Sequence, residues 1–296
     1  MAMPRPARDS LRLVALLPED IDAGLALSDA AGWNQTADDW AIFVEHGQAI
    51  GYRDTANRLV ATAATLPYGA NAGWISMVLV ADAWRHRGLA SELMAACVAH
   101  LRAANIVPVL DATPAGGAVY ARIGFEAGFE IDRWQWLAAT TGGATTEAFA
   151  PIARTLHKAS IADLDALVAL DRGATGLERR FLTESFLSRP GTSARLTSAC
   201  DGFVIARAGR RAMQIGPLVA EDPDEAIVLL ATAFASARAN VDRIFLDLPR
   251  DRPELAAWLE AQGFTRQRPF VRMSLGAAHP PKLGAKSFVL AGPEFG

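Results

Sequence analysis

Apolar residues follow two different spacings along the chain, and the two spacings alternate. Compact apolar runs of strand length occur in the first half at residues 11–16, 49–53, 59–66, 74–80, 107–111 and 129–137. Between them, apolar residues recur every three or four positions, the spacing of a half-buried helix, at residues 19–30, 37–46, 88–104 and 115–123. The last of these segments ends before Gly124, a residue typical of a helix C-terminus. The alternation predicts an α/β fold.

The pattern is interrupted once, by a stretch of small and polar residues. TTGGATTEAF occupies residues 140–149, and a strand-like run at 154–158 begins the alternation again. We therefore predict an N-terminal domain at 1–139, a linker at 140–150 and a C-terminal domain at 151–296. The last residues, KSFVLAGPEFG, are apolar enough to predict that this tail docks onto a domain.

The restart of the pattern is a repeat. Val80 and Val219 each end an apolar run, and each is followed by a helix-like segment, a strand that contains an Asp, a second helix and Gly-Phe. Gly124 lies 44 residues after Val80, and Gly263 lies 44 residues after Val219. Equal spacing over several landmarks predicts two copies of one α/β unit.

The two copies differ in charge at the turn after the valine. The first turn reads ADAWRHRGLA and the second reads AEDPDEAIVL. In this alignment Arg85 corresponds to Asp224, and Gly88 corresponds to Ile227. The repeat thus keeps the elements and changes the chemistry of the turn.

The basic turn has the composition of an anion site. A helix N-terminus presents unpaired N–H groups and the positive end of the helix dipole. Gly88 and the small Ala90 allow close approach of a ligand, while Arg85 and Arg87 supply charged donors. The pattern favours a phosphate or pyrophosphate. The alternative is a solvated surface turn that binds nothing.

The same residues resemble motif A of the GNAT superfamily, the acyl-CoA-dependent N-acyltransferases. The pattern is a strand ending at Val80, followed by Arg85-His86-Arg87-Gly88-Leu89-Ala90 at the start of a helix. A second landmark of the family is matched by Tyr120, which is followed by Gly124-Phe125. The chain resembles a tandem GNAT protein with a degenerate C-terminal copy, in which Leu259 stands in place of Tyr120. The resemblance implies two α/β units, each a mixed, mostly antiparallel twisted sheet flanked by helices.

The resemblance also implies a co-substrate and a set of site residues. Acetyl-CoA would lay its pantetheine arm along the backbone of Met77, Val78, Leu79 and Val80. Its pyrophosphate would lie on the turn of Arg85, His86, Arg87, Gly88, Leu89 and Ala90. Tyr120 would be the general acid that protonates the leaving thiolate. The alternative for Tyr120 is a packing role with a satisfied hydroxyl.

The sequence indicates less clearly which residues would bind and deprotonate the amine substrate. Residues 74–77 contain no carboxylate to serve as a base, so Ser76 or a water is a candidate proton relay. Asp111 is a second candidate, with a turn or helix-cap role as the alternative. Trp33 and Asn34 are candidate substrate-binding residues. Their alternative is a helix break in which Trp33 packs on the core and Thr36 caps the next helix.

Composition and charge narrow the possible partners, cofactors and cellular compartment of the protein. The net charge is −3 with no long basic stripe, which argues against nucleic acid as a partner. Cys97 and Cys200 lie far apart in apolar settings, which suits a reducing cytoplasm and no disulfide. The five histidines have no zinc-like spacing, so we expect no metal. We also expect no signal peptide and no membrane span.

The sequence therefore predicts a cytoplasmic N-acetyltransferase, monomer or homodimer, active in its N-terminal domain. It would move an acetyl group from acetyl-CoA to a primary amine of a small molecule or peptide. Two alternatives stay open. The first is a non-catalytic acyl-CoA-binding regulator, which needs the turn at 85–90 but not Tyr120. The second is a tandem-domain interaction scaffold, which needs neither.

Overall fold

The computed structural model describes residues 10–138, 155–277 and 282–296. Contacts within the chain divide it into two compact units, Met1–Pro108 and Val109–Gly296, and each is described by itself below. The domain boundaries expected from the repeat, 1–139 and 151–296, stay a prediction. The expected linker at 140–150 lies outside the described residues.

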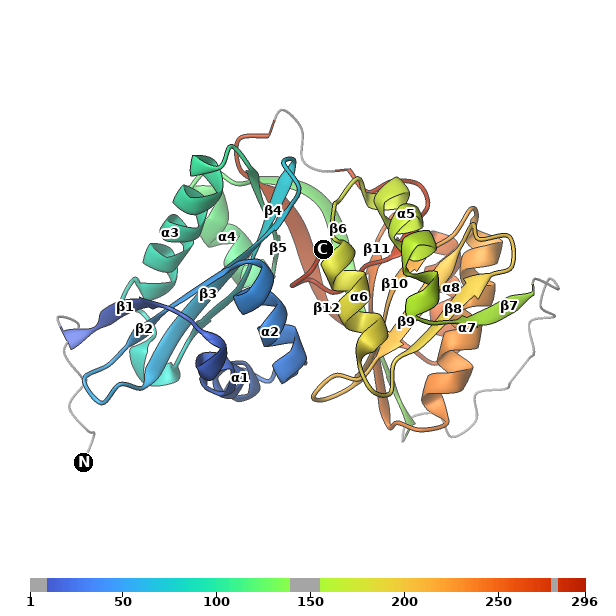
Figure 1. Cartoon of the computed structure of the whole chain (residues 1–296), viewed down its shortest axis with the longest axis horizontal. Helices are drawn as coiled ribbons and strands as arrows, with labels where there is room; N and C mark the ends of the chain where they lie inside the picture. The colour runs from blue at the N-terminus through green and yellow to red at the C-terminus, as the bar shows by residue number, and fades with distance from the viewer. Residues whose placement is uncertain (1–9, 139–154, 278–281) are drawn as a thin grey trace. The chain divides into compact units, whose positions relative to one another are not determined.

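The first unit contains an antiparallel sheet in the order β1-β2-β3-β4 (Figure 1). The strands are β1 (Arg12–Ala15), β2 (Gln48–Arg53), β3 (Leu59–Tyr68) and β4 (Ala72–Val80). The helices are α1 (Ile21–Ala30), α2 (Ala37–His46) and α3 (Leu89–Ala103). All of these elements lie where the apolar spacing predicts them.

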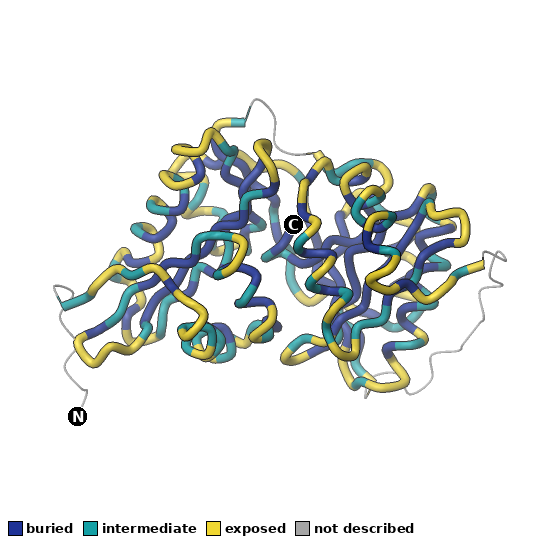
Figure 2. Tube along the Cα trace, viewed as in Figure 1, coloured by how far each residue is buried: buried dark blue, intermediate teal, exposed yellow. Residues whose placement is uncertain are grey.

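Strand β3 is buried at every position from 60 to 66, so both faces of the sheet are covered. Helix α3 packs on β3 and β4, and α1 and α2 also pack on β3. The small residues of the VATAATL stretch allow these helices to approach the sheet closely. Figure 2 shows β3 and β4 as mostly buried, whereas β1 and the outer sides of the helices are mostly exposed.

The second unit contains a longer mixed sheet in the order β5-β12-β6-β11-β10-β9-β8-β7, with β13 also paired to β10. Its strands are β5 (Val107–Ala112), which spans the division, β6 (Glu126–Leu137), β7 (Leu156–Ala159), β8 (Ser193–Thr197), β9 (Phe203–Arg207), β10 (Met213–Val219), β11 (Arg243–Pro249), β12 (Thr265–Ser274) and β13 (Ser287–Val289). Its helices are α4 (Pro114–Arg122), α5 (Leu164–Thr175), α6 (Arg180–Ser188), α7 (Pro223–Arg238) and α8 (Pro253–Ala261). Strands β10 and β11 pair in parallel, as expected for strands joined through a helix.

The order of the strands shows an exchange that the repeat does not predict. Strand β6, the last strand of the first sequence copy, pairs with β11 and β12 of the second copy. Strand β12, the last strand of the second copy, pairs with β5 of the first. Each copy therefore contributes its last strand beside a strand of the other.

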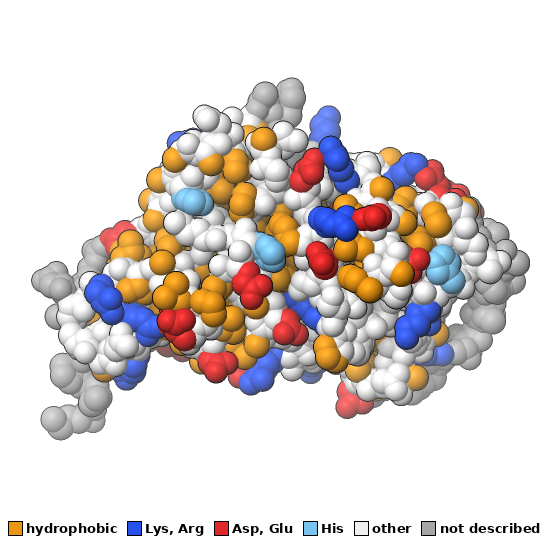
Figure 3. All heavy atoms as spheres, in the orientation of Figure 1, with side chains coloured by type: hydrophobic (Ala, Val, Ile, Leu, Met, Phe, Trp, Pro, Cys, Tyr) orange, Lys and Arg blue, Asp and Glu red, His pale blue; other side chains and the backbone are white. Residues whose placement is uncertain are grey.

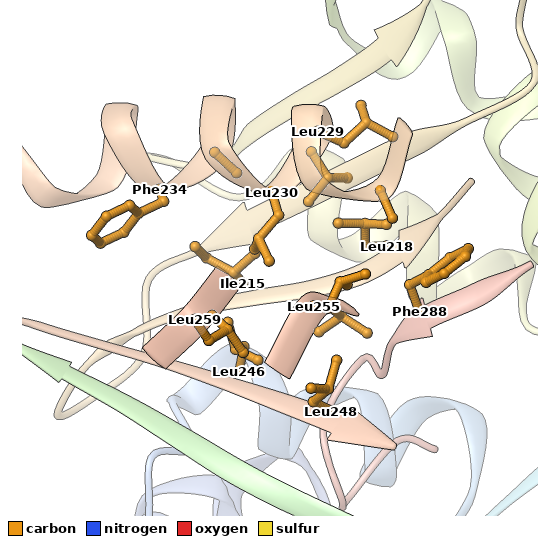
Figure 4. Close-up of a cluster of buried hydrophobic side chains, with 14 of the residues drawn as sticks. Ile215, Leu218, Leu229, Leu230, Phe234, Leu246, Leu248, Leu255, Leu259 and Phe288 are labelled. Carbon is orange, nitrogen blue, oxygen red and sulfur yellow. The ribbon is translucent and has the colours of Figure 1, made fainter. Parts of the chain in front are cut away.

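The core of the second unit lies between the sheet and helices α7 and α8 (Figure 4). Ile215, Leu218 and Leu246 project from the strands toward Leu229 and Leu255 of the helices. The amphipathic pattern of residues 223–238 places its apolar face against this sheet, which is why the segment forms a helix here.

The predicted docking of the tail is confirmed. Residues 287–289 form β13, and Phe288, Val289 and Leu290 are at most 3% exposed. Cys97 and Cys200, the two cysteines of the chain, are both free in the structure. The expected apolar setting is correct for Cys97, which is buried, and wrong for Cys200, which is exposed in the turn between β8 and β9.

Candidate functional site

The end of β4 departs from regular strand geometry. Met77 has φ 54°, in the left-handed region that non-glycine residues rarely adopt. Thr62 pairs with Leu79 and Ala64 pairs with Ser76, so β4 holds one extra residue, a β-bulge, between these pairs. The Thr62 hydroxyl donates a 2.8 Å hydrogen bond to the Met77 carbonyl and fixes the bulge. The bulge thus lies at the start of residues 77–80, the stretch where the sequence predicts a paired ligand.

A short turn leads from β4 to α3. Asp82–Trp84 form one 3-10 turn, and His86 and Gly88 then adopt φ 62° and 82°. A Cβ atom built on Gly88 would meet nothing within 4 Å, so the space in front of this residue is open. The amide of Glu92 is the donor to the Gly88 carbonyl, at 3.1 Å, which leaves the amides of residues 89–91 ahead of the first helical bond.

The two arginines of the turn contact the turn itself, and Arg85 is exposed whereas Arg87 is half-buried. Arg85 lies 2.9 Å from the Asp82 carboxylate and donates to the Val80 carbonyl at 3.2 Å. Arg87 donates to the Ala83 carbonyl at 2.9 Å and lies over the Trp84 ring. Exposed contacts of this kind contribute little stability. The printed contacts of the exposed Arg85 therefore cost little free energy to exchange for contacts with an anion at the helix start.

The equivalent helix in the second unit is capped by its own side chains. Asp222 accepts a hydrogen bond from the Glu225 amide at 2.8 Å, and Glu225 accepts one from the Glu221 amide at 2.7 Å. Helix α7 begins at Pro223, a residue type suited to the first turn of a helix. Gly88 has no side chain with which to cap α3. One helix start is thus filled by carboxylates, while the other presents its amides beside two cations.

Tyr120 lies in the last turns of α4, a helix that Thr113 caps by accepting a hydrogen bond from the Gly116 amide. Its ring packs against Phe125 with the ring centroids 6.0 Å apart. Burial raises the pKa of the Tyr120 phenol above its usual value of 10.0. The phenol is therefore protonated at neutral pH and can act as a proton donor.

Asp111 takes neither of its expected roles. Arg272 donates two hydrogen bonds of 2.8 Å to its carboxylate, and the Asp111 side chain is 0% exposed. Because Thr113 caps α4, Asp111 is not the cap either. Among the described residues, the buried Ser76 Oγ has no hydrogen-bond partner, as a group that would bind a water or substrate atom requires.

Trp33 and Asn34 follow Gly32, whose φ of 74° turns the chain after α1. Asn34 is buried and Trp33 is half-buried. Thr36 caps α2 by accepting from the Asp39 amide, and Asp39 in turn accepts from the Thr36 amide at 2.8 Å. The expected cap at Thr36 is confirmed, and a substrate role for Trp33 and Asn34 stays a prediction.

The sequence alone did not predict that a buried threonine side chain would hold the bulge of β4. Thr62 fixes the bulge, and Thr65 is a second fully buried threonine, whose Oγ1 has no partner among the described residues. The signal was present, because two threonines stand in an apolar strand where alanine or valine would suffice. A buried hydroxyl costs free energy unless it has a structural or ligand-binding use.

Comparison with known families now identifies the chain. The profile of the acetyltransferase (GNAT) family matches residues 22–125, and that of an acetyltransferase (GNAT) domain matches residues 167–288. The chain is a tandem member of the GNAT superfamily. Its two GNAT domains are of the N-acyltransferase type, and the expected fold class is confirmed.

Solved structures share the fold over nearly the whole GNAT chain. A putative acetyltransferase from Pyrococcus horikoshii is 19% identical, with a TM-score of 0.76 and coverage of 99% of both chains. A tandem GNAT protein from the clavulanic acid biosynthesis pathway is 16% identical, with a TM-score of 0.67 and coverage of 89% of this chain and 98% of that one. A GCN5-related N-acetyltransferase from Sphaerobacter thermophilus is 14% identical, with a TM-score of 0.63 and coverage of 95% and 99%. A comparison with curated proteins gives no match.

The described part of the chain has neither a membrane-spanning helix nor a cluster of metal ligands. None of its helices is both long enough and apolar enough to cross a membrane. Within the same residues, no group of three or more His, Cys, Asp or Glu side chains is placed to hold a metal ion. On the face drawn in Figure 3, acidic and basic side chains are interspersed in small groups.

Proposed function

We propose that this GNAT chain transfers an acetyl group from acetyl-CoA to a primary amine, with its active site in the N-terminal copy. One observation carries the proposal, namely the contrast between the two helix starts. The amides at the start of α3 precede the first helical bond beside Arg85 and Arg87, whereas carboxylates cap the start of α7. An anion-binding helix N-terminus in one copy and a self-capped one in the other fit one acyl-CoA per chain.

Binding would use the backbone more than the side chains. The pyrophosphate would lie in the open space at Gly88, near the amides of residues 89–91 and within reach of Arg85, His86 and Arg87. The pantetheine arm would pair with residues 77–80, where the bulge at Met77 turns backbone groups out of the β3–β4 ladder.

The chemistry would need one proton donor and one proton acceptor. The amine nitrogen attacks the thioester carbonyl, the carbon–sulfur bond breaks, and the thiolate takes a proton from Tyr120. The nitrogen then gives up the one proton that it carries in excess of the amide product, and the Tyr120 phenolate is reprotonated. The attacking amine must first lose a proton, because a free primary amine has a pKa of about 10. A water at the Ser76 hydroxyl would relay that proton to solvent. Trp33 and Asn34 are the proposed contacts for the acceptor.

A thermal-shift titration with acetyl-CoA tests the binding site. The ligand should raise the melting temperature of the native chain, because it binds the folded state. Gly88→Glu should abolish the shift by placing a carboxylate where the phosphates would lie. Gly191→Glu is the matched control, because Gly191 also has a positive φ, 77°, and open space around its Cβ position. Equal shifts in the two variants would remove the assignment of the turn at 85–90.

Two experiments separate the alternatives. A scaffold predicts no shift with acetyl-CoA, whereas a regulator predicts a shift without turnover. Release of free coenzyme A in a screen of small amines and peptide N-termini would show turnover and identify the class of acceptor. A thermal shift without coenzyme A release from any amine would favour the regulator.

A further inference from the structure

The edge of β10 that faces β11 has two different neighbours along its length. Residues 213–215 pair with β11 in parallel, and Leu218 and Val219 then pair with β13 in antiparallel fashion. The other edge of β10 pairs with β9 throughout. On the far side of β13, the Leu290 amide donates a 3.0 Å hydrogen bond to the Asp247 carbonyl of β11. The tail therefore enters the slot that opens where β10 and β11 separate.

This slot has a counterpart in the first copy. In the repeat, Leu218 and Val219 correspond to Leu79 and Val80, the last residues of the stretch that we propose to pair with pantetheine. The tail thus holds, in the second unit, the position that acyl-CoA would hold in the first. This equivalence rests on the proposed function, but the binding of the tail between β10 and β11 does not.

The turn beside this slot is acidic, whereas the equivalent turn in the first copy is basic. Where the first copy has arginines for a phosphate, the second has an acidic turn, and the Lys286 amino group pairs with the Glu221 carboxylate of that turn. The Lys286 carbonyl also accepts a 3.0 Å hydrogen bond from the Ala220 amide. The tail thus brings the positively charged Lys286 to the acidic turn of the second copy, where it pairs with Glu221. The equivalent turn of the first copy is basic.

The tail is anchored on both sides of β13. Phe288 belongs to the core cluster of the second unit, beside Leu218 and Leu255 (Figure 4). Arg252 donates to the Gly284 and Ser287 carbonyls, at 3.1 Å each. These contacts fix the segment that enters the slot.

Beyond the slot, the tail packs into a buried cluster of aromatic and charged side chains. Phe295 is 0% exposed and packs against Phe186, with the ring centroids 5.6 Å apart. The buried Arg179 donates to the Phe295 carbonyl at 3.1 Å while Asp171 holds its other nitrogens. The end of the tail is therefore buried among side chains of the second unit and does not lie on its surface.

The crossing of the tail over β10 requires a glycine. Gly216 has φ 135°, and a Cβ atom added there would lie 2.0 Å from the Leu290 carbonyl oxygen. Any other residue would push the tail backbone away from β10. Gly216 therefore does for the tail what a glycine does at a ligand site, which is to permit close backbone approach.

We propose that the slot between β10 and β11 is a peptide-binding slot whose ligand is the tail segment, residues 282–296 of the same chain. The tail binds by adding a strand to β10, by Lys286 at the acidic turn and by Phe288 in the core. While it is bound, the second unit is closed to acyl-CoA.

Cleavage of the folded chain tests this proposal. A protease recognition site is introduced within residues 278–281, and the purified native protein is cut. The 15-residue fragment 282–296 should remain with the body through size-exclusion chromatography and native mass spectrometry. A labelled synthetic peptide of the same sequence should exchange into the slot, and the same peptide with Phe288→Asp and Leu290→Asp should not.

A matched pair of glycine variants in the cut protein locates the fragment. Gly216→Ala should speed its release at least ~10-fold, because the added methyl group overlaps the Leu290 carbonyl. Gly173→Ala, in α5 with nothing within 4 Å of its Cβ position, should leave the release rate unchanged. Equal release rates in the two variants would contradict the crossing over β10.

The proposal is overturned if the fragment elutes alone while the body keeps its melting temperature and the slow hydrogen exchange of its β10 amides. None of these measurements uses acetyl-CoA. The two proposals can therefore fail separately. The thermal shift with acetyl-CoA could be absent while the tail fragment stays bound, or the shift could be present while the fragment is released.

Discussion

Arg272 of β12 lies directly opposite Asp111 of β5 in the sheet and donates two hydrogen bonds of 2.8 Å to its carboxylate. Arg133 of β6 lies opposite Asp247 of β11 in the same way, with hydrogen bonds of 2.8 and 2.9 Å. Each pair joins the penultimate strand of one sequence copy to the last strand of the other. The four side chains are at most 6% exposed, so the exchanged strands are held by two buried, reciprocal ion pairs.

The first prediction concerns the Asp111–Arg272 pair. Arg272→Met should lower the free energy of unfolding by about 3–5 kcal/mol, because it leaves a buried carboxylate without its partner. Asp111→Leu combined with Arg272→Met should recover most of that loss. Urea unfolding of both variants measures this, and equal losses in the two would show that the pair does not act as a unit.

The same variant has a predicted pH dependence. Burial raises the pKa of Asp111, whereas the charge and hydrogen bonds of Arg272 lower it. Removal of Arg272 should raise this pKa further, and a raised folded pKa contributes stability that is lost as pH rises through it. Arg272→Met should therefore be least destabilised at acidic pH. A loss of stability that is constant with pH would contradict this.

The second prediction concerns cleavage within residues 140–150. Strand β6 is hydrogen-bonded on one edge to β11 and on the other to β12. Cleavage of the predicted linker should therefore leave two fragments that elute together under native conditions and separate only in denaturant. Size-exclusion chromatography after limited proteolysis checks this. Separate elution of folded fragments would contradict the strand exchange.

The third prediction concerns Tyr120. Tyr120→Phe should keep the acetyl-CoA thermal shift and lower turnover about 100-fold, since only the proton donor is lost. Because burial raises the pKa of the phenol, Tyr120 of the native protein should stay protonated below pH 10.0. Turnover measured against pH in both proteins tests this. Unchanged turnover in Tyr120→Phe would return Tyr120 to a packing role.

The fourth prediction concerns the two thiols. Cys200 is exposed and should react with a thiol reagent in the native state, whereas Cys97 is buried, and burial raises its pKa from 9.0 to about 12. One thiol per native chain should react, and the second only on unfolding. Two fast thiols in the folded protein would contradict the burial of Cys97.

The raised pKa of Cys97 also links its ionisation to stability. A folded pKa above the unfolded value contributes stability that is lost as pH rises, here between 9.0 and about 12. Cys97→Ala should flatten this part of the stability profile, and Cys200→Ala should not. Chemical unfolding at several alkaline pH values makes the comparison.

The fifth prediction concerns stoichiometry. Calorimetric titration should give one coenzyme A per chain. Arg85→Ala with Arg87→Ala should weaken binding at least about 100-fold, since two charged hydrogen bonds worth about 1.5–3 kcal/mol each would be lost. Arg172→Ala with Arg180→Ala is the control, because both are exposed arginines of the second unit. Two equivalent sites per chain would show that the second unit also binds coenzyme A.

The helices and strands were predictable because their apolar spacing is regular and their ends carry clear signals, such as Thr36 before α2 and Gly124 after α4. The exchange of β6 and β12 was not. Their amphipathic patterns are alike, and nothing in a local pattern states which neighbouring strand a segment will meet. The reciprocal Asp and Arg positions were the available signal, and they become meaningful only once the strand order is known.

The candidate site was predictable only in part. The turn at 85–90 could be found from charge and from its position between strand and helix, because both are local. The bulge at Met77 depends on a hydroxyl of β3 and has no local signature. The slot of the second unit depends on contacts between residues separated by about 70 positions, such as Leu218 and Val289, and sequence spacing cannot reveal them.

The reciprocal placement of β6 and β12 also limits how the chain can be divided. A half-length protein ending near residue 139 would carry a 12-residue strand, β6, with neither of its hydrogen-bonding neighbours. Unpaired strand edges recruit other chains, so such a half should aggregate or pair with a second copy of itself. Each half of the repeat thus supplies the hydrogen-bonding edges that the last strand of the other half needs, so the two halves should have to be expressed together.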